Sequence, residues 1–175
     1  MRGKRRCRVL RFLYKPRFPA EIVRLLGLSK KNSVSYILSD FVESGIAVCL
    51  NPASRTGRLY SLTDKGREAL RTLLREENKE VIFTDIPIEL IPLYSEIVSS
   101  RRKSAILKGL NEIPRPPQEI RFSAKRYDND ITRVGAYHLL NWFCEKGVAL
   151  SCRKNKKLAY RLSDKGKLLK EILVK

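Results

Sequence analysis

Residue types that build enzyme and metal sites are scarce in this sequence of 175 residues. It contains four cysteines, and no two of them stand two or four positions apart as zinc or redox pairs do. The phosphate-loop, dinucleotide and zinc-protease patterns GxxxxGK[ST], GxGxxG and HExxH are also missing. The single histidine, His138, has no second histidine or spaced acidic cluster to act with. We therefore expect a protein that is not an enzyme, with no metal, no cofactor and buried, reduced cysteines.

Long apolar runs are missing too, since none approaches the roughly 20 residues of a membrane helix. The basic start "MRGKRRCRVLRFL" resembles the first part of a signal peptide, but arginines interrupt its apolar run and no small-residue cleavage site follows. We expect a cytoplasmic protein with no membrane contact. One Gln and one Met stand among 55 charged residues, a bias reported for proteins of thermophiles.

Positive charge is abundant and falls in two blocks. Residues 1–76 hold 17 Lys and Arg against 6 Asp and Glu, residues 77–100 hold 1 against 5, and residues 101–175 hold 19 against 7. Two basic blocks around an acidic segment favour two separate surfaces that face a polyanion. The alternative is a solvated charged surface with no polyanionic partner.

A heptapeptide occurs twice, as "YSLTDKG" at 60–66 and "YRLSDKG" at 160–166. Its flanks match as well, because "ILSDFVESGIAV" (37–48) aligns with "LLNWFCEKGVAL" (139–150). Apolar residues at helical spacing predict one helix over 34–42 and another over 136–144, each ended by a glycine, Gly45 or Gly147. The chain is therefore an internal repeat of two units.

Each unit has the same predicted order of elements. A short apolar helix precedes a helix opened by proline (19–27 or 116–124), and the amphipathic helix follows. The apolar run at 46–50 or 148–152 is the next predicted strand. A polar loop follows it, and the tyrosine segment then forms a second strand. Thr63 and Ser163 are expected to cap a last helix. Tyrosine and leucine of the heptapeptide should share the core face.

This order resembles the winged-helix superfamily of helix-turn-helix DNA-binding domains, in the style of small archaeal and bacterial transcriptional regulators. "LLGLSKKNSVSYILSDFVESGIA" and "LYSLTDKGREAL" carry the resemblance, which covers residues 4–76 and 101–174. The second unit departs from it, with four more residues between Ile120 and Gly147 than between Ile22 and Gly45. The whole layout is also similar to euryarchaeal tandem winged-helix regulators, a group that includes activators of archaellum genes.

The expected fold is mainly α with small β-hairpins (α+β), as two tandem winged helix-turn-helix domains joined by a partly helical connector. The expected domains are residues 1–76 and 101–175, with a connector at 77–100 that is too apolar to be a free linker. A helix over 88–98 is predicted to pack one unit against the other or against a second chain. Both a monomer with pseudo-dimeric units and a homodimer therefore remain open.

The resemblance implies a sequence-specific transcription regulator that binds double-stranded DNA, with a recognition helix in the major groove. In the first unit this helix should begin near Ser29, and loops 51–59 and 153–158 are the expected wings. Short polar residues among lysines suit close approach to DNA, although a merely solvated helix or loop is the alternative. The predicted DNA-binding residues of unit 1 are Lys30, Lys31, Asn32, Ser33, Ser35, Tyr36, Ser39, Arg55 and Arg58.

The second unit offers a parallel set, with Trp142 expected at the edge of the core or at a contact between units rather than on a base. The predicted DNA-binding residues there are Lys125, Arg126, Asn129, Thr132, Arg133, Tyr137, Arg153, Lys154, Lys156 and Lys157. A protein-interaction adaptor in a transcription or chromosome-organising complex is the second interpretation, with the basal transcription machinery as a further partner. RNA binding is disfavoured, because no sheet with several aromatic residues is predicted.

Overall fold

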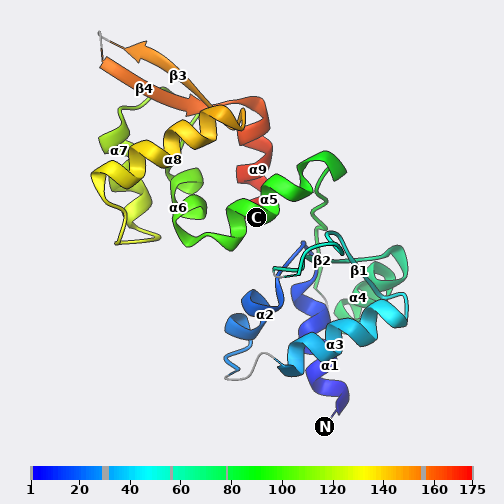
Figure 1. Ribbon diagram of the computed structural model, residues 1–175. Helices are drawn as coiled ribbons and strands as arrows, with labels where there is room; N and C mark the ends of the chain where they lie inside the picture. The colour runs from blue at the N-terminus through cyan, green and yellow to red at the C-terminus, as the bar shows by residue number, and fades with distance from the viewer. Residues whose placement is uncertain (1, 29–31, 56, 78, 155–156, 175) are drawn as a thin grey trace. The chain divides into compact units, whose positions relative to one another are not determined.

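The chain divides into two compact units, each described here by itself. The computed structural model describes residues 2–28, 32–55, 57–77, 79–154 and 157–174 (Figure 1). Unit 1 spans Met1–Pro92 and unit 2 spans Leu93–Lys175. The expected domains 1–76 and 101–175 thus fall in different units, and the segment expected to connect them, 77–100, is shared between the two.

Both units follow the same order of elements. Unit 1 runs α1 (Arg2–Phe12), α2 (Pro19–Leu25), α3 (Asn32–Glu43), β1 (Ala47–Cys49), β2 (Tyr60–Leu62), α4 (Asp64–Arg75) and the short 3-10 turn η1 (Ile88–Leu90). Helix α5 (Ile91–Ser99) begins at the boundary. Unit 2 continues with α6 (Arg101–Gly109), α7 (Pro117–Lys125), α8 (Arg133–Glu145), β3 (Ala149–Lys154), β4 (Lys157–Leu162) and α9 (Asp164–Val174). The prediction of a mainly helical α+β fold with small hairpins is confirmed.

Each sheet is a two-stranded antiparallel hairpin to which a third segment adds one bridge. In unit 1 Ala47 pairs with Leu62, and in unit 2 Ala149 pairs with Leu162. Before α2, Arg17 exchanges backbone hydrogen bonds with Tyr60 at 2.9 and 3.0 Å. Arg115 and Tyr160 make the same pair of bonds, at 3.0 and 2.9 Å. The segment that leads into the second helix is therefore tied to the returning strand in both units.

The cores form where the helices meet these hairpins. In unit 1 the side chains of Val9, Leu13, Ile22, Leu38 and Leu70 are buried together. In unit 2 the buried residues include Ile106, Ile120, Leu140, Phe143 and Leu169. Burying side chains of this size contributes roughly 1.5–3 kcal/mol each before the entropy cost of ordering them. The helical spacing in the sequence predicted Leu38, Leu140 and Phe143 among these buried positions.

Several details differ from the sequence prediction. The four cysteines, expected to be buried, are free but only partly buried. Val42, placed by its spacing on the apolar stripe of α3, is 39% exposed, because it lies at the edge of the buried face. Ser61 is buried between Tyr60 and Leu62 rather than facing outward. The segment 153–158 is not all loop, because β3 continues to Lys154 and β4 begins at Lys157, with Arg153 paired to Leu158.

The glycine of the repeated heptapeptide packs against the backbone just after the third helix in each unit. A Cβ atom added to Gly66 would lie 2.0 Å from the carbonyl oxygen of Ile46, and one added to Gly166 would lie 2.0 Å from that of Val148. A Cβ atom cannot come this close to a carbonyl oxygen to which it is not bonded. Glycine is therefore required at these two positions by close approach of another part of the backbone, rather than by a positive φ angle.

The residues one and three positions before each glycine also bind this junction. Thr63 Oγ1 accepts a hydrogen bond from the Gly66 amide at 3.2 Å and donates to the Gly45 carbonyl at 2.6 Å. Lys65 Nζ donates to the carbonyl of Ser44 at 2.9 Å. Unit 2 repeats the arrangement, with Ser163 Oγ 2.6 Å from the Gly147 carbonyl oxygen and Lys165 Nζ 3.1 Å from that of Lys146. The predicted caps at Thr63 and Ser163 are confirmed.

Replacing Gly166 by Ala should destabilise unit 2 by about 3 kcal/mol, because the backbone carbonyl of Val148 cannot rotate away from the added methyl group. Urea unfolding followed by the fluorescence of Trp142, the single tryptophan, measures this loss. Gly3→Ala is the control, since a Cβ there would meet no atom within 4 Å. Equal unfolding midpoints for Gly166→Ala and the unchanged protein would contradict the expected clash.

Candidate nucleic-acid interface

Helix α3 presents one apolar face to the core and one polar face to solvent. Val34 and Leu38 are fully buried, and Ile37 and Phe41 nearly so. On the other side Ser35 and Ser39 are exposed, and Tyr36 is 72% exposed. The predicted separation of the two faces is confirmed for these residues. The outward face is thus made of short hydroxyl side chains around one large aromatic ring.

The start of this helix is only partly described. Helix α3 has Asn32 as its first residue, whereas the sequence predicted a start near Ser29, and residues 29–31 lie outside the described ranges. Predictions for Lys30 and Lys31 therefore stay predictions, as does that for the side chain of Asn32. Ser33 is half-buried on the first turn.

The loop between β1 and β2 is held by Asn51. Its Nδ2 donates to the Gly57 carbonyl at 3.0 Å, and its Oδ1 accepts from the Leu59 amide at 2.6 Å. Gly57 has a φ angle of 67°, a value at which glycine avoids the strain of other residues. Arg55 and Arg58 lie exposed on this loop, and Arg58 Nε donates to the Ser54 carbonyl at 3.3 Å. Two cations are thus presented on an internally bonded loop.

In unit 2 the candidate residues before α8 lie on two different elements. Lys125 is the last residue of α7 and is half-buried, Arg126 is its exposed C-cap, and Asn129 follows in the exposed turn. Thr132 caps α8, because its Oγ1 accepts from the Gly135 amide at 3.0 Å. The sequence treated Thr132 as a contact residue, whereas in the structure its hydroxyl oxygen organises the helix start.

Helix α8 begins at Arg133, which is exposed, and Tyr137 is half-buried one turn later. Between them on the same surface Val134 is 66% exposed. The outward side of α8 therefore begins with a cation and an exposed apolar side chain, whereas that of α3 carries serines around Tyr36. The side chain of Tyr160, in the core beneath, donates to Asn141 Oδ1 at 3.0 Å, and burial raises the pKa of this phenol above its usual value.

The four extra residues of unit 2 surround a buried carboxylate that the sequence did not single out. Asp128 is 3% exposed, and its Oδ1 accepts from the Asp130 amide at 3.1 Å and lies 4.0 Å from Arg101 Nε. An Asp side chain that accepts a hydrogen bond from the backbone amide two residues later forms an Asx-turn. Asp128, together with Arg101 at the start of α6, therefore orders the longer turn between α7 and α8.

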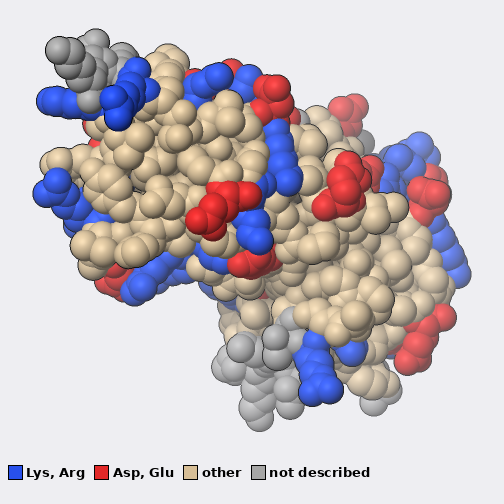
Figure 2. All heavy atoms as spheres, turned by 45° about the horizontal axis from the view of Figure 1, so that its top comes forward, with Lys and Arg blue, Asp and Glu red and all other residues tan. Residues whose placement is uncertain are grey.

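The β3–β4 hairpin carries further cations at its outer end. Arg153 and Lys157 are exposed there, while Lys156 and the side chain of Lys154 lie outside the described residues. Figure 2 shows Lys and Arg side chains gathered around this end of unit 2. Strand pairing extends to Lys154 and Lys157, so these charges lie on a hairpin arm rather than on a flexible loop.

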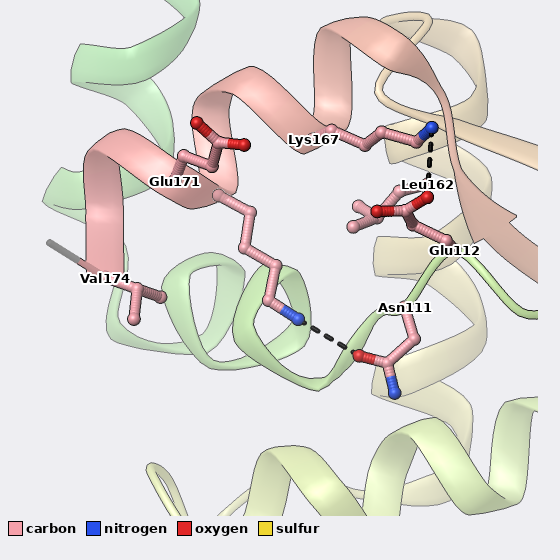
Figure 3. Close-up of a pocket in the computed structure, with 7 residues that line it drawn as sticks. Asn111, Glu112, Leu162, Lys167, Glu171 and Val174 are labelled. Atoms are coloured by element: carbon pink, nitrogen blue, oxygen red, sulfur yellow. Dashed lines mark hydrogen bonds and ion pairs between the residues drawn. The ribbon is translucent and has the colours of Figure 1, made fainter.

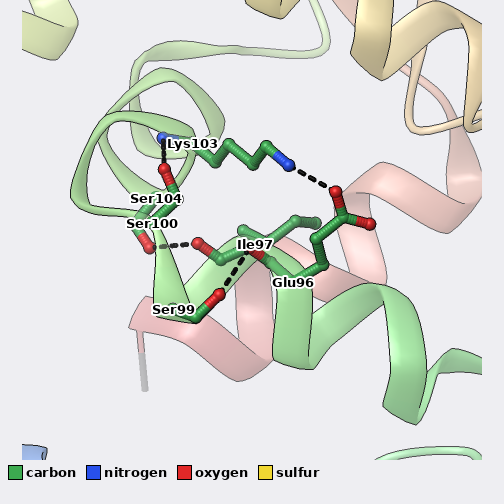
Figure 4. Close-up of polar contacts among 6 residues, drawn as sticks. All are labelled: Glu96, Ile97, Ser99, Ser100, Lys103 and Ser104. Carbon is green, nitrogen blue, oxygen red and sulfur yellow. Dashed lines mark hydrogen bonds and ion pairs between the residues drawn. The ribbon is translucent and has the colours of Figure 1, made fainter. Parts of the chain in front are cut away.

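Trp142 is bound into the edge of the unit 2 core. Its ring meets Phe143 edge to face at 5.1 Å between centroids, and Lys103 Nζ lies 3.8 Å from its centroid. The ammonium group of Lys103 also pairs with Glu96, and Ser104 Oγ donates to the Ile97 carbonyl at 2.9 Å (Figure 4). These contacts join α5, α6 and α8 within unit 2. They support the expected structural role of Trp142 over base stacking.

Other kinds of site are not indicated by the described residues. No three His, Cys, Asp or Glu side chains among them gather closely enough to hold a metal ion. Of the helices in the described ranges, none combines the length and apolar character that a membrane crossing requires. No family model, curated protein or solved structure matches the chain. Its function is therefore inferred from the surfaces of the two units.

Thr132→Ala should destabilise unit 2 by about 1 kcal/mol, because the first turn of α8 loses the acceptor for its Gly135 amide. Thr132→Ser should restore most of the stability, since serine supplies the same oxygen. Urea unfolding monitored by Trp142 fluorescence compares the three proteins. A serine variant as unstable as the alanine variant would show that the hydroxyl group does not carry the effect.

Proposed function

We propose that the protein is a sequence-specific transcription regulator that binds double-stranded DNA through two tandem winged-helix units. The observation that carries this proposal is the repeated order of three helices, a hairpin and a helix, in which α3 turns a hydroxyl-rich face with Tyr36 to solvent. A helix of this kind fits the major groove, which is about 12 Å wide. Small outward side chains allow its backbone to approach the base edges.

The two hairpins would hold the phosphate backbone. Arg55 and Arg58 on the first, and Arg153 and Lys157 on the second, are exposed cations on ordered supports. Contacts to phosphates contribute affinity and set the orientation of the protein, but they distinguish little between one base sequence and another. The excess of 19 positive charges would add a sequence-independent attraction to any duplex.

Unit 1 is the better candidate for base recognition, because short hydroxyl side chains surround Tyr36 on α3, whereas the branched Val134 is exposed on the first turn of α8. Since the two units differ on their outer surfaces, the target site should be asymmetric. A selection of bound sequences from random duplex DNA would test binding, specificity and half-site symmetry together.

A second candidate is a tandem winged-helix adaptor in a transcription or chromosome-organising complex. It is favoured by large apolar side chains exposed on both units, with Ile82 at 83% and Ile88 at 84% in unit 1 and Phe122 at 55% and Val134 at 66% in unit 2. Exposed apolar residues of this size mark protein contacts when they gather in one patch. In that case unit 1 would hold DNA, or neither unit would, and unit 2 would hold a protein of the transcription machinery.

Duplex binding should weaken steeply with salt. If about six phosphates are neutralised, the logarithm of the binding constant should fall with the logarithm of salt concentration at a slope of about −5. Fluorescence anisotropy of a labelled duplex over a series of salt concentrations measures this slope. A flat response would rule out a binding mode based on the basic hairpins.

Tyr36→Ala should reduce the preference for a selected duplex over a scrambled one, because the exposed ring lies on the face assigned to the bases. Arg55→Ala should instead weaken both duplexes alike and reduce the salt slope by about 1. Arg75→Ala, which removes an exposed arginine of α4, is the matched control. If replacing Lys30, Tyr36 and Arg55 together left DNA affinity intact but abolished a protein complex, the adaptor would be the correct function.

A further inference from the structure

In unit 1 the chain that follows α4 returns across one face of that helix. Val81 and Phe83 pack against the core, and the Thr84 amide donates to the Tyr14 carbonyl at 3.1 Å. The guanidinium groups of Arg67 and Arg71 lie over the Phe83 ring, 5.5 and 5.1 Å from its centroid. Residues 81–85, "VIFTD", thus cover this face as an extended segment, which we call the covering segment.

A carboxylate fixes the far end of the covering segment. Arg67 NH1 donates to Asp85 Oδ2 at 3.1 Å, and its other terminal nitrogen pairs with Asp85 Oδ1. Phe83 and Asp85 are two residues apart, the spacing at which side chains of an extended chain point to the same side. One helix face therefore receives an aromatic ring and a carboxylate from the same short segment.

The equivalent face of unit 2 is formed by α9. The heptapeptide aligns Gly66 with Gly166, so Arg67, Leu70 and Leu74 correspond to Lys167, Lys170 and Val174. The shared bridges of Arg17 and Arg115 to the tyrosine strand align Tyr14 with Glu112 in the same way. Among the residues that the structure describes, no segment follows α9 across this face.

A cavity of about 370 Å³ lies there instead. The cavity is lined by Lys167, Glu171 and Val174 of α9 and by Asn111 and Glu112 of the segment after α6, and Figure 3 shows the Lys167 side chain reaching toward Glu112. Leu162 of β4 forms an apolar part of the wall. Lys167 Nζ pairs with Glu112 at 3.1 Å and with Asp164 at 3.3 Å. The cavity is thus the counterpart of the surface that the covering segment occupies in unit 1.

Lys170 distinguishes this cavity from the surface of unit 1, where leucine holds the same position. Its ammonium group donates to the Leu110 carbonyl and, at 3.1 Å, to Asn111 Oδ1, both neutral acceptors. Burial, followed by repulsion from the nearby Arg115, lowers the pKa of Lys170 below its ordinary value. A carboxylate brought close to the ammonium group would oppose both effects, because a neighbouring negative charge favours the protonated form of lysine.

We propose that this cavity binds an extended segment of a partner protein that carries an aromatic side chain and, two residues later, a carboxylate. The ring would occupy the space between Leu162 and Val174. Because Lys167, the counterpart of Arg67, already pairs with Glu112 and Asp164, the carboxylate would approach Lys170 instead. The inference goes beyond DNA binding and does not depend on it. The basis of the proposal is that the covering segment of the same chain, with Phe83 and Asp85, already occupies the equivalent face of unit 1.

The test uses the full chain and a fluorescent peptide with the sequence of Glu80–Ile86, "EVIFTDI", with blocked ends. Fluorescence anisotropy should show saturable binding to the unchanged protein. Lys170→Glu should weaken it at least about tenfold, because it places a like charge beside the peptide carboxylate. Val174→Glu, a change at a side chain that is 60% exposed and so carries little risk of unfolding, should have a similar effect.

Two controls separate a specific site from charge attraction and from binding to unit 1. Lys157→Glu changes the net charge as Lys170→Glu does, on the hairpin away from the cavity lining, and should leave peptide affinity within about twofold. Arg67→Ala, on the covered face of unit 1, should not weaken peptide binding. Peptides with Phe→Ala or Asp→Asn replacements should each bind several-fold more weakly to the unchanged protein.

Several results would overturn the proposal. Absence of saturable peptide binding would do so, as would equal weakening by Lys157→Glu and Lys170→Glu. Loss of binding in Arg67→Ala with retention in Val174→Glu would place the peptide on unit 1. Self-association of the chain in sedimentation velocity that Val174→Glu abolishes would identify the covering segment of a second copy, and not a partner protein, as the occupant.

Discussion

The close approach of two backbone segments is the constraint on which each unit depends. Gly66 lies against the carbonyl of Ile46, and Gly166 against that of Val148, at distances that leave no room for a side chain. This contact fixes the last helix against the turn that ends α3 or α8. Because the hairpin lies between these two points in the chain, its position is fixed at the same time. The outward face of the third helix is then held at a constant position relative to the hairpin.

The polar residues of the heptapeptide secure the same junction. Backbone carbonyls at the end of a helix have no partner within it, and each must find one elsewhere. Lys65 and Lys165 donate to such carbonyls, while Thr63 and Ser163 serve both the helix that ends and the helix that begins. The repetition of the motif is explained by this structural task. Functional differences between the units must therefore lie in other residues.

These differences are found on the outer surfaces. Helix α3 carries serines and Tyr36, whereas α8 carries Val134 and a longer preceding turn built around Asp128. The β1–β2 loop is organised by Asn51, whereas the β3–β4 hairpin is an extended ladder with cations at its end. The helix after the hairpin is covered by residues 81–85 in unit 1 and lines a cavity in unit 2. One scaffold thus presents two different outer surfaces.

The sequence by itself determined the elements whose signals are local. Helical spacing, the glycine stops and the Thr63 and Ser163 caps placed α3, α8, α4 and α9, since each signal acts within one or two turns. Most outward residues of α3 followed from the same spacing, whereas their role toward DNA stays a prediction.

Only the tertiary structure decided features that depend on segments distant in the chain. The need for Gly66 arises from Ile46, twenty positions earlier. Val42 is partly exposed although its helical spacing places it on the apolar stripe. The covering of α4 by Phe83 and the cavity beside Lys170 depend on how the chain returns over a helix face. No local pattern encodes these contacts, because they form only when elements far apart in the sequence have been brought together.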